Sequence, residues 1–247
     1  MPRKRCANLL TTTNTMMIQE SEIGVIIPAY NEGPMIGEVV AHVRSCGYPH
    51  VVVIDDGSKD DTRQRALEAG AEVVSHLINR GAGAASQTGI HYARQRGFSY
   101  IIQLDADGQH HPEDMKALIE KMAEGKYEIV IGSRFIQMSE GIPAMRVAYN
   151  RISNLLTNWF CRGSYSDSQS GFRMLNRKAI ETLNLGLDGF GYCSEMIVVA
   201  ERNGLSIGEV PISVSYTEYS MSKGQDIHMG VTTAINLLWK LIFHQTH

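Results

Sequence analysis

Short apolar runs alternate with amphipathic stretches through the first 132 residues of the chain. The apolar runs have the length of strands, and the stretches between them have the period of helices that bury one side. This alternation predicts an α/β protein whose mostly parallel, open sheet is flanked by helices. The predicted strands are 23–28, 51–54, 71–75, 100–104 and 128–131.

Proline, glycine and polar capping residues indicate where the helices begin and end. Pro34 and Pro112 predict helix starts, because proline is favoured in the first turn. Ser58 followed by Asp61 resembles a capping box and predicts a third start. A glycine that can adopt a left-handed conformation ends each helix between these strands. The predicted ends are near Gly47, Gly70, Gly97 and Gly125.

The rhythm changes after residue 132. A long helix is predicted at about 143–161, a second near 192–203, a strand near 208–214 and a terminal helix from about 228. No repeat and no long linker divides the chain. We therefore expect one domain at 23–227, preceded by a disordered extension at 1–22 and followed by a helix at 228–247.

Composition narrows the class of protein. The net charge of −3 gives no broad basic surface, which argues against a nucleic-acid partner. The four cysteines have no paired spacing, so we expect reduced thiols and a cytoplasmic protein. No apolar stretch reaches the roughly 18 residues of a spanning helix, and the first 20 residues lack the apolar core of a secretory signal.

The strongest chemical signal follows the fourth predicted strand, where residues 104–109 read LDADGQ. Side chains two apart in an extended segment share a side, so Asp105 and Asp107 converge on one point. Two such carboxylates repel each other unless a cation lies between them. Their hard oxygen atoms suit Mg²⁺ or Mn²⁺. The alternative is a solvated turn that caps the next helix.

The three preceding strands also end in residues of ligand-binding types. Tyr30 offers a flat face for a nucleobase, and Glu32 offers a hydrogen-bond acceptor. Asp55 and Asp56 point to opposite faces, so only one of them should accept a hydrogen bond from a base or a ribose. The glycines in 79–84 (NRGAGA) allow close approach of the backbone to a ligand, with Arg80 available for a phosphate or base. A turn explains each run on its own.

Later runs add three further candidates. Arg134 follows the fifth strand, a polar loop at 167–173 (DSQSGFR) follows the long helix, and 220–224 (SMSKG) is a basic segment that could close over phosphates. Surface loops explain each of these alone. The ends of parallel strands share one edge of a sheet, however, so four consecutive polar strand ends indicate one binding site.

Taken in order, these motifs resemble glycosyltransferase family 2, the nucleotide-sugar transferases of the GT-A fold. The resemblance spans residues 23–223 and is greatest to the branch of dolichyl-phosphate mannosyltransferases and other polyprenyl-phosphate glycosyltransferases. It implies a single GT-A domain with a Rossmann-like nucleotide-binding half and an acceptor-binding half. The matching runs are 28–32 (PAYNE), 55–58 (DDGS), 79–83 (NRGAG), 105–110 (DADGQH), 132–134 (GSR) and 170–173 (SGFR).

The resemblance and the motifs together assign residues to the site. The candidate donor-binding residues are Pro28, Tyr30, Glu32, Ile54, Asp56, Arg80, Asp105 and Ala106. The candidate metal ligands, for Mg²⁺ or Mn²⁺, are Asp105, Asp107 and Gln109. The candidate catalytic residues are Asp107, Arg134, Asp167 and Lys223, of which Arg134 and Lys223 would face phosphates.

Two positions depart from the pattern of the branch. Its members carry an arginine six residues before the lysine that matches Lys223, where this chain has Thr217. The glycine of their G-x-S-K segment is Ser220 here. The grip on an acceptor phosphate is therefore in question. The terminal helix carries an apolar face that would cover the core, contact a partner or lie peripherally on a membrane surface.

We expect inverting transfer of a sugar from a GDP- or UDP-sugar to a polyprenyl or dolichyl phosphate. A phosphate acceptor is already anionic and needs no general base. The main alternative is a hydroxyl acceptor on a glycan, for which Asp167 is the natural base. Nucleotidyl transfer and regulatory binding of a nucleotide sugar are further alternatives, and they differ in releasing pyrophosphate or in lacking turnover.

Overall fold

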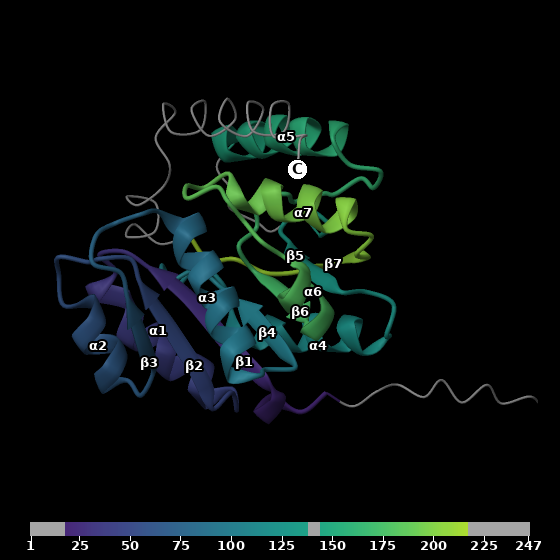
Figure 1. The fold of residues 1–247 in the computed structure, drawn as a ribbon. Helices are drawn as coiled ribbons and strands as arrows, with labels where there is room; N and C mark the ends of the chain where they lie inside the picture. The colour runs from purple at the N-terminus through teal and green to yellow at the C-terminus, as the bar shows by residue number, and fades with distance from the viewer. Residues whose placement is uncertain (1–17, 138–143, 217–247) are drawn as a thin grey trace, which may run out of the picture.

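One open sheet organises the protein. The computed structural model describes residues 18–137 and 144–216, and within these residues seven strands pair in the order β3-β2-β1-β4-β6-β5-β7 (Figure 1). Every pairing is parallel except those of β6, which runs antiparallel between β4 and β5. The predicted α/β class with a mostly parallel sheet is confirmed.

The strands match the predicted apolar runs closely, with one addition. β6, a strand of four residues, was not predicted. The strand predicted near 208–214 is β7, which begins one residue earlier and ends sooner. The strands are β1 (Ile23–Ala29), β2 (His50–Asp55), β3 (Glu72–Ser75), β4 (Tyr100–Gln103), β5 (Ile129–Ser133), β6 (Arg173–Asn176) and β7 (Ile207–Pro211).

Helices cover both faces of the sheet. The first face carries α1 (Gly33–Ser45), α2 (Thr62–Glu68) and α4 (Met115–Ala123), and the second carries α3 (Ala82–Arg96), α6 (Arg177–Thr182) and α7 (Tyr192–Arg202). The long helix α5 (Ala144–Trp159) packs outside α7 (Figure 1). Two short 3-10 helices, η1 (Glu20–Glu22) and η2 (Pro112–Asp114), complete the described elements. No helix among the described residues combines the length and the hydrophobicity needed to cross a bilayer.

Burial on both faces explains why the strands are almost wholly apolar. Val25 and Ile27 of β1 pack toward α1, whereas Ile26 between them packs toward α3. Successive strand residues point to opposite faces, so a strand that is covered twice needs an apolar residue at every position. Each aliphatic side chain that is fully buried contributes roughly 1.5–3 kcal/mol. The core therefore holds the strand ends at fixed positions.

Two local predictions were wrong. Ser58 and Asp61 form no capping box, because α2 begins at Thr62 and Asp61 makes no side-chain cap bond. The Ser58 hydroxyl instead accepts a hydrogen bond from the N–H of Asn31, across 27 residues of sequence. The extension predicted to reach residue 22 is also too long, because Glu20–Glu22 already form η1.

Candidate functional site

The polar strand ends meet at one edge of the sheet, as the sequence predicted. Ala29 at the end of β1 lies opposite Asp55 at the end of β2, which in turn lies opposite Ser75 of β3. On the other side of β1, the N–H of Leu104 donates to the carbonyl of Ile26. The loops that follow these strands consequently leave the sheet side by side.

Two hydrogen bonds from backbone N–H groups to side chains join the first two of these loops, and we call this pair of bonds the latch. The N–H of Glu32 donates to Thr62 Oγ1 at 2.8 Å, and the N–H of Gly33 donates to Asp60 Oδ2 at 3.0 Å. Each bond joins residues far apart in sequence, so the loop that carries Tyr30 and Glu32 is fixed before any ligand arrives. Tyr30 keeps an exposed ring beside this latch.

Asp107 lies in an electrostatic environment that disfavours its charge. Burial, followed by the negative charge of Asp105, raises the pKa of Asp107 to about 6, and the charge of Glu32 acts in the same direction. One hydrogen bond opposes this, from the N–H of Gln109 to Asp107 Oδ1 at 3.0 Å. Asp105 and Glu32 therefore both disfavour the negative charge of Asp107, and a cation bound beside Asp107 would offset this effect.

Asp105 is held in the ionised form by its neighbours. Burial alone would raise its pKa, but the hydrogen bond and charge of His110 and the charges of Arg134 and Arg173 outweigh burial, so the pKa of Asp105 is lowered. Nε2 of the buried His110 lies 3.1 Å from Asp105 Oδ2, and its ring packs against Phe172. The Asp105 side chain remains 48% exposed. His110 therefore orients the Asp105 carboxylate, which stays accessible to a ligand.

Arg134 and Asp167 form a buried ion pair next to these acids. The Asp167 carboxylate is fully buried and accepts from Arg134 Nε at 2.7 Å, from Arg134 Nη2 at 2.8 Å and from the Arg134 backbone N–H at 3.1 Å. Burial would lower the pKa of Arg134, but the hydrogen bond and charge of Asp167 raise it overall. A carboxylate occupied in this way is a poor base, so the geometry opposes the predicted base role of Asp167 and favours one in orienting Arg134.

The loop at 167–173 also reaches Asp105, because it leads into β6, which pairs with β4. A Cβ at Gly171 would overlap Asp105 Oδ1, so only glycine allows this loop to pack against the carboxylate. Arg173 of β6 is fully buried and donates to the carbonyls of Ser168, Ser170 and Cys193. Its charge compensates the acids from within the protein.

Asp56, in contrast, is engaged by the protein itself. Its side chain is 3% exposed and accepts from the N–H groups of Arg80 at 3.0 Å and Gly81 at 2.6 Å. Nδ1 of His76 lies 2.6 Å from Asp56 Oδ1, and Nε2 of His76 lies 2.8 Å from Thr88 Oγ1. Asp56 thus anchors the loop that follows β3. A contact from Asp56 to a nucleobase stays a prediction.

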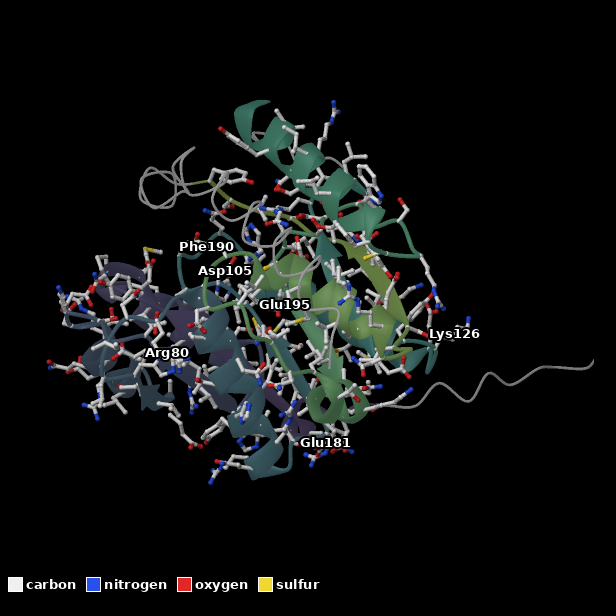
Figure 2. The ribbon with its side chains drawn as sticks, turned by 45° about the horizontal axis from the view of Figure 1, so that its top comes forward. Arg80, Asp105, Lys126, Glu181, Phe190 and Glu195 are labelled. Carbon is white, nitrogen blue, oxygen red and sulfur yellow. The ribbon has the colours of Figure 1, made fainter. Side chains whose placement is uncertain are left out.

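The glycine-rich run 79–84 lies against a later loop of the same chain. The N–H of Gly83 donates to the carbonyl of Asp188 at 2.7 Å, and a Cβ at Gly83 would overlap the carbonyl of Leu187. The glycine therefore admits another loop of the same chain, where approach to a ligand was predicted. Glu195 of α7, labelled in Figure 2, holds that loop by accepting from the N–H of Leu187 at 2.8 Å. Arg80 Nη2 lies 3.5 Å from Asp188 Oδ1.

A comparison with known families decides the class of this site. The model described as "Glycosyl transferase family 2" matches residues 24–183, which is more than half of the chain. The chain belongs to glycosyl transferase family 2. The predicted resemblance is confirmed, and the matched region contains the latched loops, the acids and Arg134.

Relatives and solved structures agree with this assignment. The UDP-N-acetylglucosamine–dolichyl-phosphate N-acetylglucosaminyltransferase of Methanococcus voltae is 35% identical, over 87% of this chain and 94% of the relative. The polyprenol monophosphomannose synthase of Mycolicibacterium smegmatis is 31% identical, over 81% and 79%. A crystal structure of glucosyl-3-phosphoglycerate synthase from Mycobacterium tuberculosis, with Mn²⁺, UDP-glucose and phosphoglyceric acid, superposes with a TM-score of 0.70 at 20% identity, over 89% and 78%. The last of these shows that the fold is that of GT-A glycosyltransferases.

Within this family 2 fold, the remaining candidates fall into three groups. Pro28 and Ile54 pair across β1 and β2, and Ile54 is fully buried. Ala106 and Gln109 are buried in the loop that carries the acids. Lys223, Thr217, Ser220 and the helix predicted at 228–247 lie outside the described residues.

Sequence reasoning did not assign roles to His110 and Arg173. Both stand inside quoted motifs, His110 directly after Gln109 and Arg173 at the end of SGFR. Polar residues inside a motif next to apolar strands are a usable signal. Part of their surroundings is distant in sequence, however: His110 packs against Phe172, and Arg173 donates to the carbonyl of Cys193, and no local pattern identifies these contacts.

Proposed function

We propose that this family 2 glycosyltransferase moves a sugar from a GDP- or UDP-sugar to a polyprenyl or dolichyl phosphate, with inversion and with a divalent metal ion. The observation that carries the proposal is the cluster of Glu32, Asp105 and Asp107 at the open edge of the sheet, with Arg134 beside it. The acids supply negative charge for a cation, and the arginine supplies positive charge for phosphates.

The donor set fits Mg²⁺ or Mn²⁺. Asp105 is ionised and partly exposed, and burial with the charges of Asp105 and Glu32 raises the pKa of Asp107, so a bound cation would stabilise the charged form of Asp107. We assign the ligands to Asp105, Asp107 and Gln109, which offer the hard oxygen atoms that these ions prefer. When bound, the ion supplies Lewis-acid stabilisation of the leaving diphosphate.

Residues of the chain would bind and position the sugar donor. Tyr30 and Glu32 are fixed by the latch to the second loop, so they can receive the nucleoside without reorganisation. Asp56 keeps the neighbouring loop in place and, with Arg80, borders the same edge. Ala106 adds its backbone to the donor side of the site. His110 and Gly171 set the direction in which Asp105 faces.

Arg134 provides fixed positive charge for the transition state. Its guanidinium is held by both oxygens of Asp167, which prevents it from rotating away as charge develops on the phosphates. Lys223 is the second candidate for that charge. Asp167 itself orients Arg134 and takes no proton, which suits an acceptor that is already anionic.

The relatives support a lipid phosphate as the acceptor. The name of the protein from M. voltae specifies dolichyl phosphate, and that of the protein from M. smegmatis specifies polyprenol monophosphomannose as its product. A hydroxyl acceptor would need a free base, and Asp167, the candidate for that role, is occupied by Arg134. A lipid-phosphate acceptor would place the enzyme at a membrane surface during catalysis.

The decisive experiment offers purified protein a matched pair of acceptors. Polyprenyl phosphate and the corresponding polyprenol, both in detergent micelles, are incubated with UDP- or GDP-sugars and Mn²⁺ or Mg²⁺, and glycolipid and nucleoside diphosphate are measured. We expect product from the phosphate, release of nucleoside diphosphate, and none from the alcohol. Equal transfer to the alcohol, or release of pyrophosphate, would contradict the proposal.

A further inference from the structure

A second set of metal-binding side chains lies away from the acids of the sheet edge. His42 and Cys46 stand four residues apart at the end of α1, on one side of the helix. Glu113 of η2 faces them, with Oε1 2.7 Å from His42 Nε2. One ligand atom from each of the three residues lies within 4.8 Å of the other two.

The chemistry of this cluster differs from that of the acids. It offers one nitrogen, one sulfur and one oxygen, a set typical of Zn²⁺, whereas Mg²⁺ and Mn²⁺ prefer oxygen alone. We propose that His42, Cys46 and Glu113 bind a zinc-type divalent cation, with water as the fourth ligand. No residue of the candidate active site takes part.

The three ligand atoms, now within 4.8 Å of one another, must rearrange around the ion. Ligand atoms of a tetrahedral zinc site lie roughly 3.3 Å apart, given bonds of about 2.0 Å to nitrogen and oxygen. His42 and Glu113 must therefore separate slightly from their present hydrogen bond. Their side chains are 45% and 61% exposed, so both can rotate and solvent ions can reach them.

The thiol of Cys46 keeps its proton until the cation arrives. Burial raises the pKa of Cys46, and the negative charge of Glu113 raises it further. Binding would form a bond from the cation to sulfur, break the S–H bond and release that proton to the solvent. The reaction needs no oxidant or reductant.

Such a cation would fasten two segments that frame the active site. α1 begins directly after Glu32, and η2 follows the loop of Asp105 and Asp107. That loop already packs on α1, because Gly108 lies against Met35 and Val39. A cation between α1 and η2 would therefore stabilise the position of the acidic loop. We expect cation binding to raise the stability of the protein before it changes the rate of sugar transfer.

The test uses Cd²⁺ as a probe, because a Cd²⁺–thiolate bond gives an ultraviolet charge-transfer absorption that oxygen ligands do not give. Full-length protein, reduced with a phosphine, is titrated with Cd²⁺ in the presence of excess Mg²⁺. We expect a band that saturates at one equivalent, with one proton released. Zn²⁺ should abolish the band by competition and should raise the melting temperature.

Matched variants identify the ligands. Cys46→Ser should lose the band and the thermal shift, and His42→Ala and Glu113→Gln should each weaken Cd²⁺ binding at least tenfold. Cys161→Ser, a half-buried cysteine elsewhere in the chain, is the control and should keep the band. Glycosyl transfer by Cys46→Ser should stay within about twofold of the parent protein.

Three results would overturn the inference. These are the absence of a band, its loss in Cys161→Ser with retention in Cys46→Ser, or unchanged Cd²⁺ affinity in both His42→Ala and Glu113→Gln. Because the band reports sulfur alone, these outcomes are independent of whether Asp105 and Asp107 bind a metal ion.

Discussion

Two strand ends at the same edge of the sheet carry aspartates in opposite situations. Asp56, after β2, is buried and accepts hydrogen bonds from His76 and from two backbone N–H groups. Asp107, after β4, accepts one hydrogen bond and lies among other negative charges. The protein therefore satisfies the first carboxylate by itself, whereas burial and nearby acids disfavour the charge of the second.

This difference in hydrogen bonding and electrostatic environment distinguishes the two aspartates better than the sequence around them does. Both aspartates follow an apolar strand and stand in an acidic, glycine-containing turn. An acid whose hydrogen bonds are complete contributes to stability, whereas an acid whose charge is disfavoured needs a ligand. Substitutions at the two sites should thus have opposite consequences for folding and activity.

The largest effect is expected for Asp107→Ala. Loss of this carboxylate removes a ligand of the ion that stabilises the leaving diphosphate, so transfer should fall by about 10³-fold or more. Product formation at saturating Mn²⁺ measures the loss. The circular dichroism spectrum should not change, and full turnover in the variant would contradict the assignment.

Arg134→Ala should come next. Removal of a fixed positive charge from the transition state typically costs on the order of 10²–10³-fold in turnover. Asp167→Asn leaves the guanidinium in place and loosens its hold, so a loss of roughly 10–100-fold is expected. Steady-state kinetics of the two variants distinguish the loss of the Arg134 charge from the loss of its orientation. A loss in Asp167→Asn as large as that in Arg134→Ala would favour a direct role for Asp167.

Asp56→Asn should act on folding. The new amide group would point N–H against the N–H groups of Arg80 or Gly81, which leaves buried donors unpaired. We expect a loss of about 1–3 kcal/mol in the free energy of unfolding, measured in urea. The matched variant Asp107→Asn removes an unfavourable charge and should lose no stability in metal-free buffer at pH 7.5. Equal losses of unfolding free energy in Asp56→Asn and Asp107→Asn would contradict the proposed difference between the two aspartates.

The smallest effect concerns pH. The folded-state pKa of Asp107, about 6, lies above its ordinary value of 3.8, so its charged form destabilises the metal-free fold. That destabilisation is present above pH 6 and is relieved as pH falls through 6 toward 4. Protonation also competes with the metal ion, so affinity for Mn²⁺ should fall about tenfold from pH 7.5 to pH 5. Calorimetric titration tests this, and an unchanged affinity would show that Asp107 is not a ligand.

The sequence predicted the part of the molecule that depends on local pattern. β1, β2 and β4 are apolar runs buried on both faces, so their position and the acids that follow them could be predicted from neighbouring residues. β6 escaped prediction because it has four residues, begins with the charged Arg173 and pairs with strands distant in the chain.

The same limit applies inside the site. Asp167 was assigned a chemical role from its loop, yet its partner Arg134 lies 33 residues away. Gly83 was interpreted as an approach to a ligand, whereas its neighbour is a loop more than 100 residues later. Residue types indicate which groups can act. Only the folded chain determines which of them are already occupied.

The reversed direction of β6 has a consequence for how such enzymes can diversify. Because β6 runs opposite to β4 and β5, it starts at the edge where those two strands end, and the intervening excursion from Arg134 to Phe172 leaves and rejoins the sheet at that edge. Its length and composition can change without shifting a single strand pair. This segment can therefore vary between relatives while the pairing of β1 with β2 and β4 stays the same.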